Sequence, residues 1–265
     1  MSQISDREFC DAVIATKKDT KLVAAAKNDR INSPESLYRE FVKLSVDRQR
    51  EIINTISSDH FVGAQWKVAF QLNNLPAAAL ADGIQAVGKA LFFSRDEDCV
   101  KAVVRAIRIY QDSPFFKSVV AGLAEAAETV GTDLATVADA ITDPEIFGLT
   151  RSLDPSSPVS GKIVSSICKM ASYTKDSAAT IDTAKFLYAR RFSASLESVI
   201  SVLENAVFMA RDRKSVKAIL AGLGAGAIDS VLQRHAGNKQ VIGQIRDIAW
   251  KTRNPDAIRN FLEAL

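Results

Sequence analysis

Apolar residues recur along most of the chain at the spacing of an α-helix, which is the feature that most restricts its fold. The clearest series at positions i, i+3, i+4 and i+7 are Ile84, Val87, Gly88, Leu91 and Val199, Val202, Leu203, Ala206. Alternation of apolar and polar residues, the mark of strands, is nearly absent, and alanine is abundant within the helical segments. The sequence therefore predicts an all-α fold.

Proline, asparagine and serine punctuate these segments and predict about 15 to 17 short helices. An Asp, Asn or Ser followed by proline suits a helix N-cap, as at Ser113-Pro114, Asp143-Pro144 and Asn254-Pro255. The helices are expected near residues 5–17, 19–28, 34–44, 46–57, 59–73, 76–92, 97–110, 114–129, 133–142, 158–173, 176–190, 194–209, 213–222, 225–235, 239–251 and 255–264.

One segment, residues 152–161, cannot continue a helix because it holds two prolines and four serines. The charge changes sign there. Residues 1–150 carry 17 Lys and Arg against 21 Asp and Glu, whereas residues 151–265 carry 17 against 10. The segment is either a linker between an acidic helical region, 1–151, and a basic one, 162–265, or a long loop within one domain.

The composition is that of an ordinary globular chain, with 47% hydrophobic and 25% charged residues. No apolar run approaches the roughly 20 residues that span a bilayer, and the first residues lack the pattern of a secretory signal. The three cysteines lie far apart and read as buried thiols in a reducing compartment. These features predict a cytoplasmic protein that does not bind membranes.

An internal similarity links two distant segments of the chain. Residues 80–107 align without gaps on residues 196–223. The shorter pattern within them is a polar residue, an Asp or Asn, an apolar residue four positions later, a base, and further apolar residues. It starts at Arg95, Gln111, Arg211 and Arg253, with a degenerate copy at Arg191. The Asp or Asn would cap a helix, and the apolar residues would form one buried stripe. Starts at Arg211 and Arg253 predict about 42 residues for a pair of helices.

This arrangement resembles the HEAT and armadillo-type helical repeats, in which the pattern occupies the second helix of each repeat. The resemblance covers about residues 95–125 and 190–265. It implies stacked antiparallel helix pairs that form an α-solenoid. An irregular helical bundle would show the same periodicity and stays open as the alternative.

The base within the pattern, at Lys101, Lys117, Lys217 and Arg259, has two interpretations. It can pair with the acidic residues or carbonyls of a neighbouring unit, which would make a structural ladder. It can instead form a row of cations that meets phosphates. We prefer the ladder, because the acidic residue recurs with the base.

The densest basic sites lie in the C-terminal half of the chain. If residues 176–190 and 213–222 stack, these side chains would line one edge and could contact a phosphate backbone. Few aromatic residues lie among them, so stacking with bases is poorly supported. The candidate nucleic-acid-binding residues are Arg190, Arg191, Arg211, Arg213, Lys214 and Lys217.

Few residues point to chemistry. His60 and His235 are the only histidines, and no pattern suits a metal, so we expect no catalytic residue, metal or cofactor. The glycines at 222, 224 and 226 follow a helix rather than a strand, which favours close helix packing over a dinucleotide site. Asp247 with Arg246 and Trp250 is the one local set that would suit a HEAT-like DNA glycosylase.

The sequence thus leaves three hypotheses. The first is a non-catalytic scaffold that binds a protein partner, or a second copy of itself, through a groove or face of the helical array. The second is a nucleic-acid-binding protein that uses the basic C-terminal half. The third, the glycosylase, is the only enzyme among them.

Overall fold

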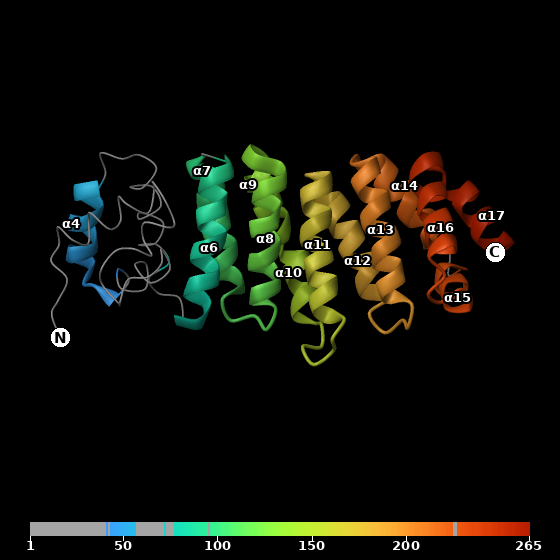
Figure 1. The fold of residues 1–265 in the computed structure, drawn as a ribbon, viewed down its shortest axis with the longest axis horizontal. Coiled ribbons are helices and arrows are strands. Elements are labelled where there is room, and N and C mark those ends of the chain that lie inside the picture. Colours follow the sequence, from blue (N-terminus) through green and yellow to red (C-terminus); the bar gives the residue numbers. More distant parts are fainter. Residues whose placement is uncertain (1–40, 42, 57–71, 73–76, 95, 225–226) are drawn as a thin grey trace.

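The computed structural model describes residues 41, 43–56, 72, 77–94, 96–224 and 227–265 (Figure 1). These residues are almost entirely helical, and no strand occurs among them, which confirms the predicted all-α fold. The predicted helices near 5–17, 19–28 and 59–73 lie wholly or almost wholly outside the described residues, as do Cys10, His60 and Trp66.

The observed helices match the predicted ranges closely after residue 76, with one addition. They are α4 (Val46–Ile56), α6 (Ala77–Ser94), α7 (Glu97–Tyr110), α8 (Phe116–Val130), α9 (Leu134–Ile141), α10 (Pro144–Arg151), α11 (Ser160–Thr174), α12 (Ser177–Ala189), α13 (Leu196–Ala210), α14 (Arg213–Leu223), α15 (Ala227–Arg234), α16 (Lys239–Thr252) and α17 (Pro255–Ala264), with a short 3-10 helix, η1 (Gly131–Asp133). Helix α10 was not predicted, although Asp143 and Pro144 begin it as the expected cap and first residue.

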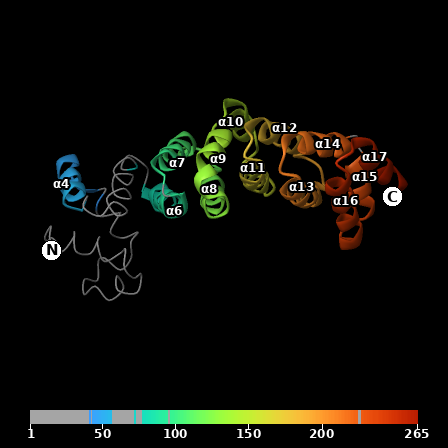
Figure 2. The ribbon, with the colours of Figure 1, turned by 90° about the horizontal axis from the view of Figure 1, so that it is seen from above.

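From α6 onward the helices form two layers. One, which we call the inner layer, consists of α6, α8, α11, α13 and α16 packed in that order, and the outer layer consists of α7, α9, α12, α14 and α17. Each inner helix leads through a short turn to its outer partner, so the pairs are antiparallel. Seen from above, the two rows arch gently, with the inner layer inside the arch (Figure 2).

Four of the turns from inner to outer helices share a positive φ at the residue that ends the inner helix. Gly131, Lys175, Arg211 and Arg253 end the inner helices α8, α11, α13 and α16 with φ of 55°, 51°, 59° and 47°. After the last three of these residues, an Asp or Asn caps the outer helix through its side chain. Asp96 does the same for α7. The capping role that the sequence pattern predicted for the copies at Arg95, Arg211 and Arg253 is confirmed.

The copies of the pattern that start at Gln111 and Arg191 lie in a different kind of turn. These turns lead from an outer helix to the next inner helix. Asp112 caps no helix there, because α8 begins at Phe116 with Phe115 at its N-cap and no side-chain cap bond. Ser113 Oγ accepts from the Phe115 N–H at 3.2 Å in the preceding turn, but α8 begins two residues later than the cap predicted at Ser113-Pro114 requires. The apolar spacing of the following inner helix imitates that of an outer helix, and sequence spacing alone did not separate the two.

Two additional short helices explain the spacing of the pairs. Lys175 and Arg211 lie 36 residues apart, with only α12 and α13 between them. Gly131 and Lys175 lie 44 residues apart, and Arg211 and Arg253 lie 42 apart, because α10 and α15 are inserted in these intervals. The predicted length of 42 residues thus describes a pair together with a third helix.

The segment predicted as a linker or long loop lies between α10 and α11, and α11 begins inside it at Ser160. The helices on its two sides contact each other, since α11 packs on α8 and α9, and α12 packs on α9 and α10. One cluster of buried apolar residues extends from one side of the loop to the other.

Close contacts between neighbouring helices within each layer depend on two glycines. A Cβ atom on Gly122 of α8 would lie 2.5 Å from the Cβ of Cys168 on α11. A Cβ atom on Gly222 of α14 would lie 2.7 Å from the Cβ of Ile258 on α17. The expected close packing at Gly222 is therefore present, and Gly122 plays the same part in the inner layer.

Candidate binding surfaces

The six predicted phosphate-binding residues do not form one surface. Arg190 and Arg191 follow the C-terminus of α12, whereas Arg211, Arg213, Lys214 and Lys217 surround the N-terminus of α14. The 15-residue helix α13 separates the two groups, a length of about 22 Å at 1.5 Å per residue. Helices α12 and α14 do contact each other, but they run in the same direction, so the end of one does not meet the beginning of the other.

Arg190 serves the fold and is largely buried, with 12% of its side chain exposed. Its Nε donates to Asp229 Oδ2 at 3.2 Å, and its guanidinium lies over the ring of Phe186, 3.8 Å from the centroid. Asp229 also accepts hydrogen bonds from the hydroxyls of Ser193 and Ser195, at 2.7 and 2.8 Å. This carboxylate joins α15 to the loop before α13, so Arg190 is not available to a phosphate.

Arg191 is held between two aromatic rings. Its guanidinium carbon lies 4.1 Å from the ring centroid of Tyr188 and 4.4 Å from that of Phe192, and its Nη1 donates to the Tyr188 carbonyl at 3.0 Å. Phe192 itself is 83% exposed. The sequence analysis found few aromatic residues among these cations, and Tyr188 and Phe192 are two that contact Arg191.

The four cations around the start of α14 are exposed. The Arg211 side chain folds back on its own helix, donating from Nε to the Phe208 carbonyl at 3.1 Å and lying 5.0 Å from the Phe208 ring centroid. Asp212 lies among the cations and caps α14, and hydrogen bonds from Ser215 lower the pKa of its carboxyl group. We call Arg211, Arg213, Lys214 and Lys217 the α14 basic group.

The ion pairs described for the recurring base lie within single helices, so they do not support the predicted ladder between units. Lys101 pairs with Asp98 and Arg259 pairs with Asp256, three residues earlier on their own helices, and Lys117 and Lys217 are exposed.

A different set of residues connects neighbouring helices of the inner layer. Lys89 of α6 pairs with Glu128 of α8, and Lys162 and Lys169 of α11 pair with Glu197 and Glu204 of α13. In each case the earlier helix supplies the lysine and the next helix the glutamate. The partners lie 35 or 39 residues apart in sequence, so only the stacking reveals them.

Aromatic residues and a methionine lie near the C-terminal ends of three inner helices, with α8, which has none there, between the first helix and the other two; we call these residues the aromatic row. It consists of Phe93 on α6, Tyr173 on α11, and Phe208 and Met209 on α13. Phe93 and Phe208 are 41% exposed and Met209 is 44% exposed. The rings of Tyr173 and Phe208 meet edge to face with centroids 5.1 Å apart. Tyr173 and Met209 each lie two residues before the turn residues Lys175 and Arg211, and Phe93 aligns with Met209 in the internal similarity.

In the set suggested for a glycosylase, the carboxylate of Asp247 forms ion pairs. Asp247 accepts from Lys251 Nζ at 3.1 Å and from Arg246 Nε at 3.3 Å, and these contacts, chiefly that of Lys251, lower the pKa of Asp247. Trp250 packs against the core.

His235, at the end of α15, lies with Nε2 3.3 Å from the Leu265 carbonyl oxygen. Within the described part of the chain no group of three or more His, Cys, Asp or Glu could hold a metal ion.

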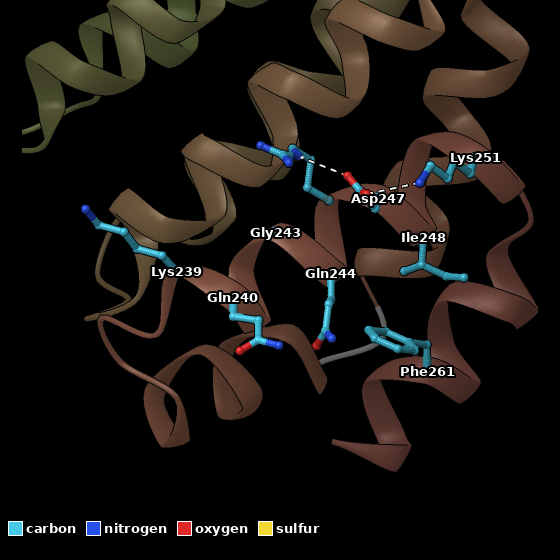
Figure 3. A pocket seen from close by; sticks show the side chains of 9 residues that line it. Lys239, Gln240, Gly243, Gln244, Asp247, Ile248, Lys251 and Phe261 are labelled. Carbon is cyan, nitrogen blue, oxygen red and sulfur yellow. Dashed lines mark hydrogen bonds and ion pairs between the residues drawn. The ribbon is translucent and has the colours of Figure 1, made fainter.

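A shallow hollow of about 470 Å³ lies on α16 and reaches α17. Figure 3 shows Gln240, Gln244 and Phe261 facing the same open space, with Ile248 beside them. Cations border it. We call this the α16 hollow, and its lining is Lys239, Gln240, Gly243, Gln244, Arg246, Asp247, Ile248, Lys251 and Phe261.

Comparisons of the chain with protein-family models, with curated proteins and with solved structures give no match.

Among the described residues no single helix has the length and apolar character to cross a membrane. One pair bent by 63°, α14 with residues 228–234, meets those two criteria together.

Proposed function

We propose that this chain is a non-catalytic binding protein, a HEAT-like scaffold that recognises a protein partner through the inner layer of its helical array. The aromatic row is the observation that supports the proposal most. Exposed Phe and Met side chains, here with the half-buried Tyr173 beside Phe208, are typical of protein interfaces. A partner that covered Phe93, Phe208 and Met209 would remove apolar surface from water that the fold itself leaves exposed.

The electrostatics of the inner layer agree with this proposal. Its lysines and glutamates neutralise one another across helices, at Lys89–Glu128 and at the two pairs between α11 and α13. Such a surface carries little net field to attract a polyanion. It therefore favours recognition by shape and apolar contact over recognition by charge.

Site-specific photocrosslinking tests the proposal. A photoreactive residue at position 209 is expected to give a discrete crosslinked protein in cells that express the chain at native level. The same residue at position 221, exposed on the outer-layer helix α14, is the matched control. The Phe208→Ser substitution should abolish the product. Equal crosslinking from both positions, or a product that persists after Phe208→Ser, would count against the aromatic row.

The α14 basic group supports a second candidate function, binding of nucleic acid. Its four side chains are exposed around one helix N-terminus, whereas Arg190 and Arg191 are engaged elsewhere. Four phosphate contacts predict a slope of about −3 to −4 when the logarithm of affinity is plotted against that of salt concentration. Fluorescence anisotropy with labelled DNA and RNA measures it. Changing all four residues to Ala should remove the binding, and Arg191→Ala should leave it; the reverse result would reject this candidate.

A further inference from the structure

The α16 hollow lies on one particular face of α16. In each earlier inner helix, the corresponding face packs against the following inner helix. The left-handed turn residues give a common reference for comparing these faces. Nine residues before them lie Gly122, Ser166 and Val202, all buried, and Gln244, which is exposed. Five residues before them lie Ala126, Met170 and Ala206, all buried, and Ile248, which is partly exposed.

The outer layer shows the same difference. Phe261 is the seventh residue after the cap Asn254, and it lines the hollow. The seventh residues after the caps Asp176 and Asp212 are Thr183 and Ile219, both fully buried. No described helix fills this position of the stack beyond α16 and α17. The shape of the face is therefore that of a seat for a helix.

The inner layer also shows which charges meet between its helices. At the α6–α8 and α11–α13 junctions the earlier helix supplies lysine and the helix seated on it supplies glutamate, whereas at the α8–α11 junction Glu125 of the earlier helix acts on Lys169 of the later one. The α16 hollow has Lys239, Arg246 and Lys251 on its border and one acidic residue, Asp247, which is already paired with two of them. Its charge is positive, and its floor includes the apolar side chains of Ile248 and Phe261.

We infer that the α16 hollow binds an amphipathic helix with acidic flanks, supplied by a protein partner. This inference rests on the proposed binding function but assigns it a second surface, separate from the aromatic row. The apolar ridge of the helix lies on Ile248 and Phe261. Its carboxylates accept from Lys239 and Lys251, which are 12 residues apart on α16 and hence about 18 Å apart along its axis. The amides of Gln240 and Gln244 donate to the polar side chains between them.

The probe for this site is a helix-stapled peptide with the sequence of residues 196–210. This is the helix that sits on α11 within the protein and presents Glu197 and Glu204 to its lysines. Isothermal titration calorimetry with the full chain is expected to show binding. Changing both glutamates of the peptide to lysine should weaken it at least tenfold. The double variant Lys239→Glu and Lys251→Glu should weaken binding of the original peptide to a similar degree and restore binding of the lysine peptide.

Controls separate the alternatives. Lys217→Glu makes the same charge change on α14, outside the hollow, and should leave the affinity unchanged. Phe208→Ser should also leave it unchanged, so failure of the aromatic row and failure of the α16 hollow give different results. Equal binding of the two peptides, or no effect of the double variant, would overturn the inference. So would a dimer in analytical ultracentrifugation that the double variant dissociates, because the occupant would then be a second copy.

Discussion

At the scale of single residues, glycines allow helices in the described part of the fold to pack closely, because they have no side chain. Gly122 allows α8 and α11 to approach closely at Cys168. The Cys168 thiol is fully buried there, and burial raises the pKa of this thiol to about 12. The thiol is therefore protonated and acts as an apolar packing group. Burial of this kind agrees with the expectation that the cysteines are packing residues; Cys99 is buried as well.

Gly122→Ala is expected to lower the free energy of unfolding by about 1–3 kcal/mol, because the added methyl group would meet backbone-anchored atoms of Cys168. Thermal and urea denaturation measure the change. Gly148→Ala is the matched control, since a Cβ at that helical position meets nothing within 4 Å. That variant should be as stable as the wild type or more stable by up to about 1 kcal/mol. Equal effects of the two substitutions would contradict the close approach.

Arg211 is a residue whose backbone suits glycine better than arginine, with a φ of 59°. Both Arg211→Gly and Arg211→Ala remove the contacts with Phe208, but only glycine relieves the left-handed conformation. The glycine variant should therefore be more stable than the alanine variant by about 1 kcal/mol. The melting temperatures of the two variants test this prediction. An alanine variant at least as stable as the glycine variant would show that the left-handed backbone at this turn does not lower stability.

At the scale of elements, the outer helices α7, α12, α14 and α17 begin with a side-chain cap, whereas α9 begins without one. Asp96, Asp176, Asp212 and Asn254 accept hydrogen bonds from backbone N–H groups in the first turn. These helices are short, and several of the turn residues before them have the left-handed φ. The cap both satisfies the free N–H groups and fixes the direction of the chain as it passes to the outer layer.

Asp212 makes one of these caps dependent on pH. Hydrogen bonds from Ser215 lower its pKa in the folded protein below the value of about 3.9 expected when unfolded. Its charged form therefore adds stability above that value, and the contribution is lost as pH falls through the folded pKa. Asp212→Asn keeps the cap, as Asn254 does, without this titration. The stability difference between wild type and Asp212→Asn should shrink as pH falls from about 5 to 2; urea denaturation across that range tests it, and a constant difference would refute it.

At the scale of the whole molecule, helices contact mainly those of the adjacent pairs in sequence order. A disturbance at one junction is therefore expected to open that end of the stack first. Gly222→Ala disturbs the junction of α14 with α17. Hydrogen exchange read by mass spectrometry should show faster exchange in α16 and α17, while α7 to α9 keep their protection. A uniform increase across all these helices would instead indicate one cooperative unit.

Most of the described helices could be predicted from the sequence because they depend on local features. Apolar spacing and a polar cap act within one or two turns of the chain, so the ranges near 97–110, 213–222 and 255–264 agree with α7, α14 and α17 to within a residue. The failures have local causes too. Helix α10 buries only Ile146 and Thr150 and so has little apolar pattern, and the turn at Gln111 has the same apolar spacing as the capped turns.

The sequence by itself determined that this chain forms short capped helices, since each is encoded by residues three or four positions apart. Only the tertiary structure decided which side chains meet. It buried Arg190 against Asp229, set Arg191 at the other end of α13 from Arg213, and paired lysines with glutamates of the next inner helix. These contacts join residues more than 30 positions apart. They depend on how each pair is rotated and seated on its neighbour, which arises from the packing of many apolar residues together.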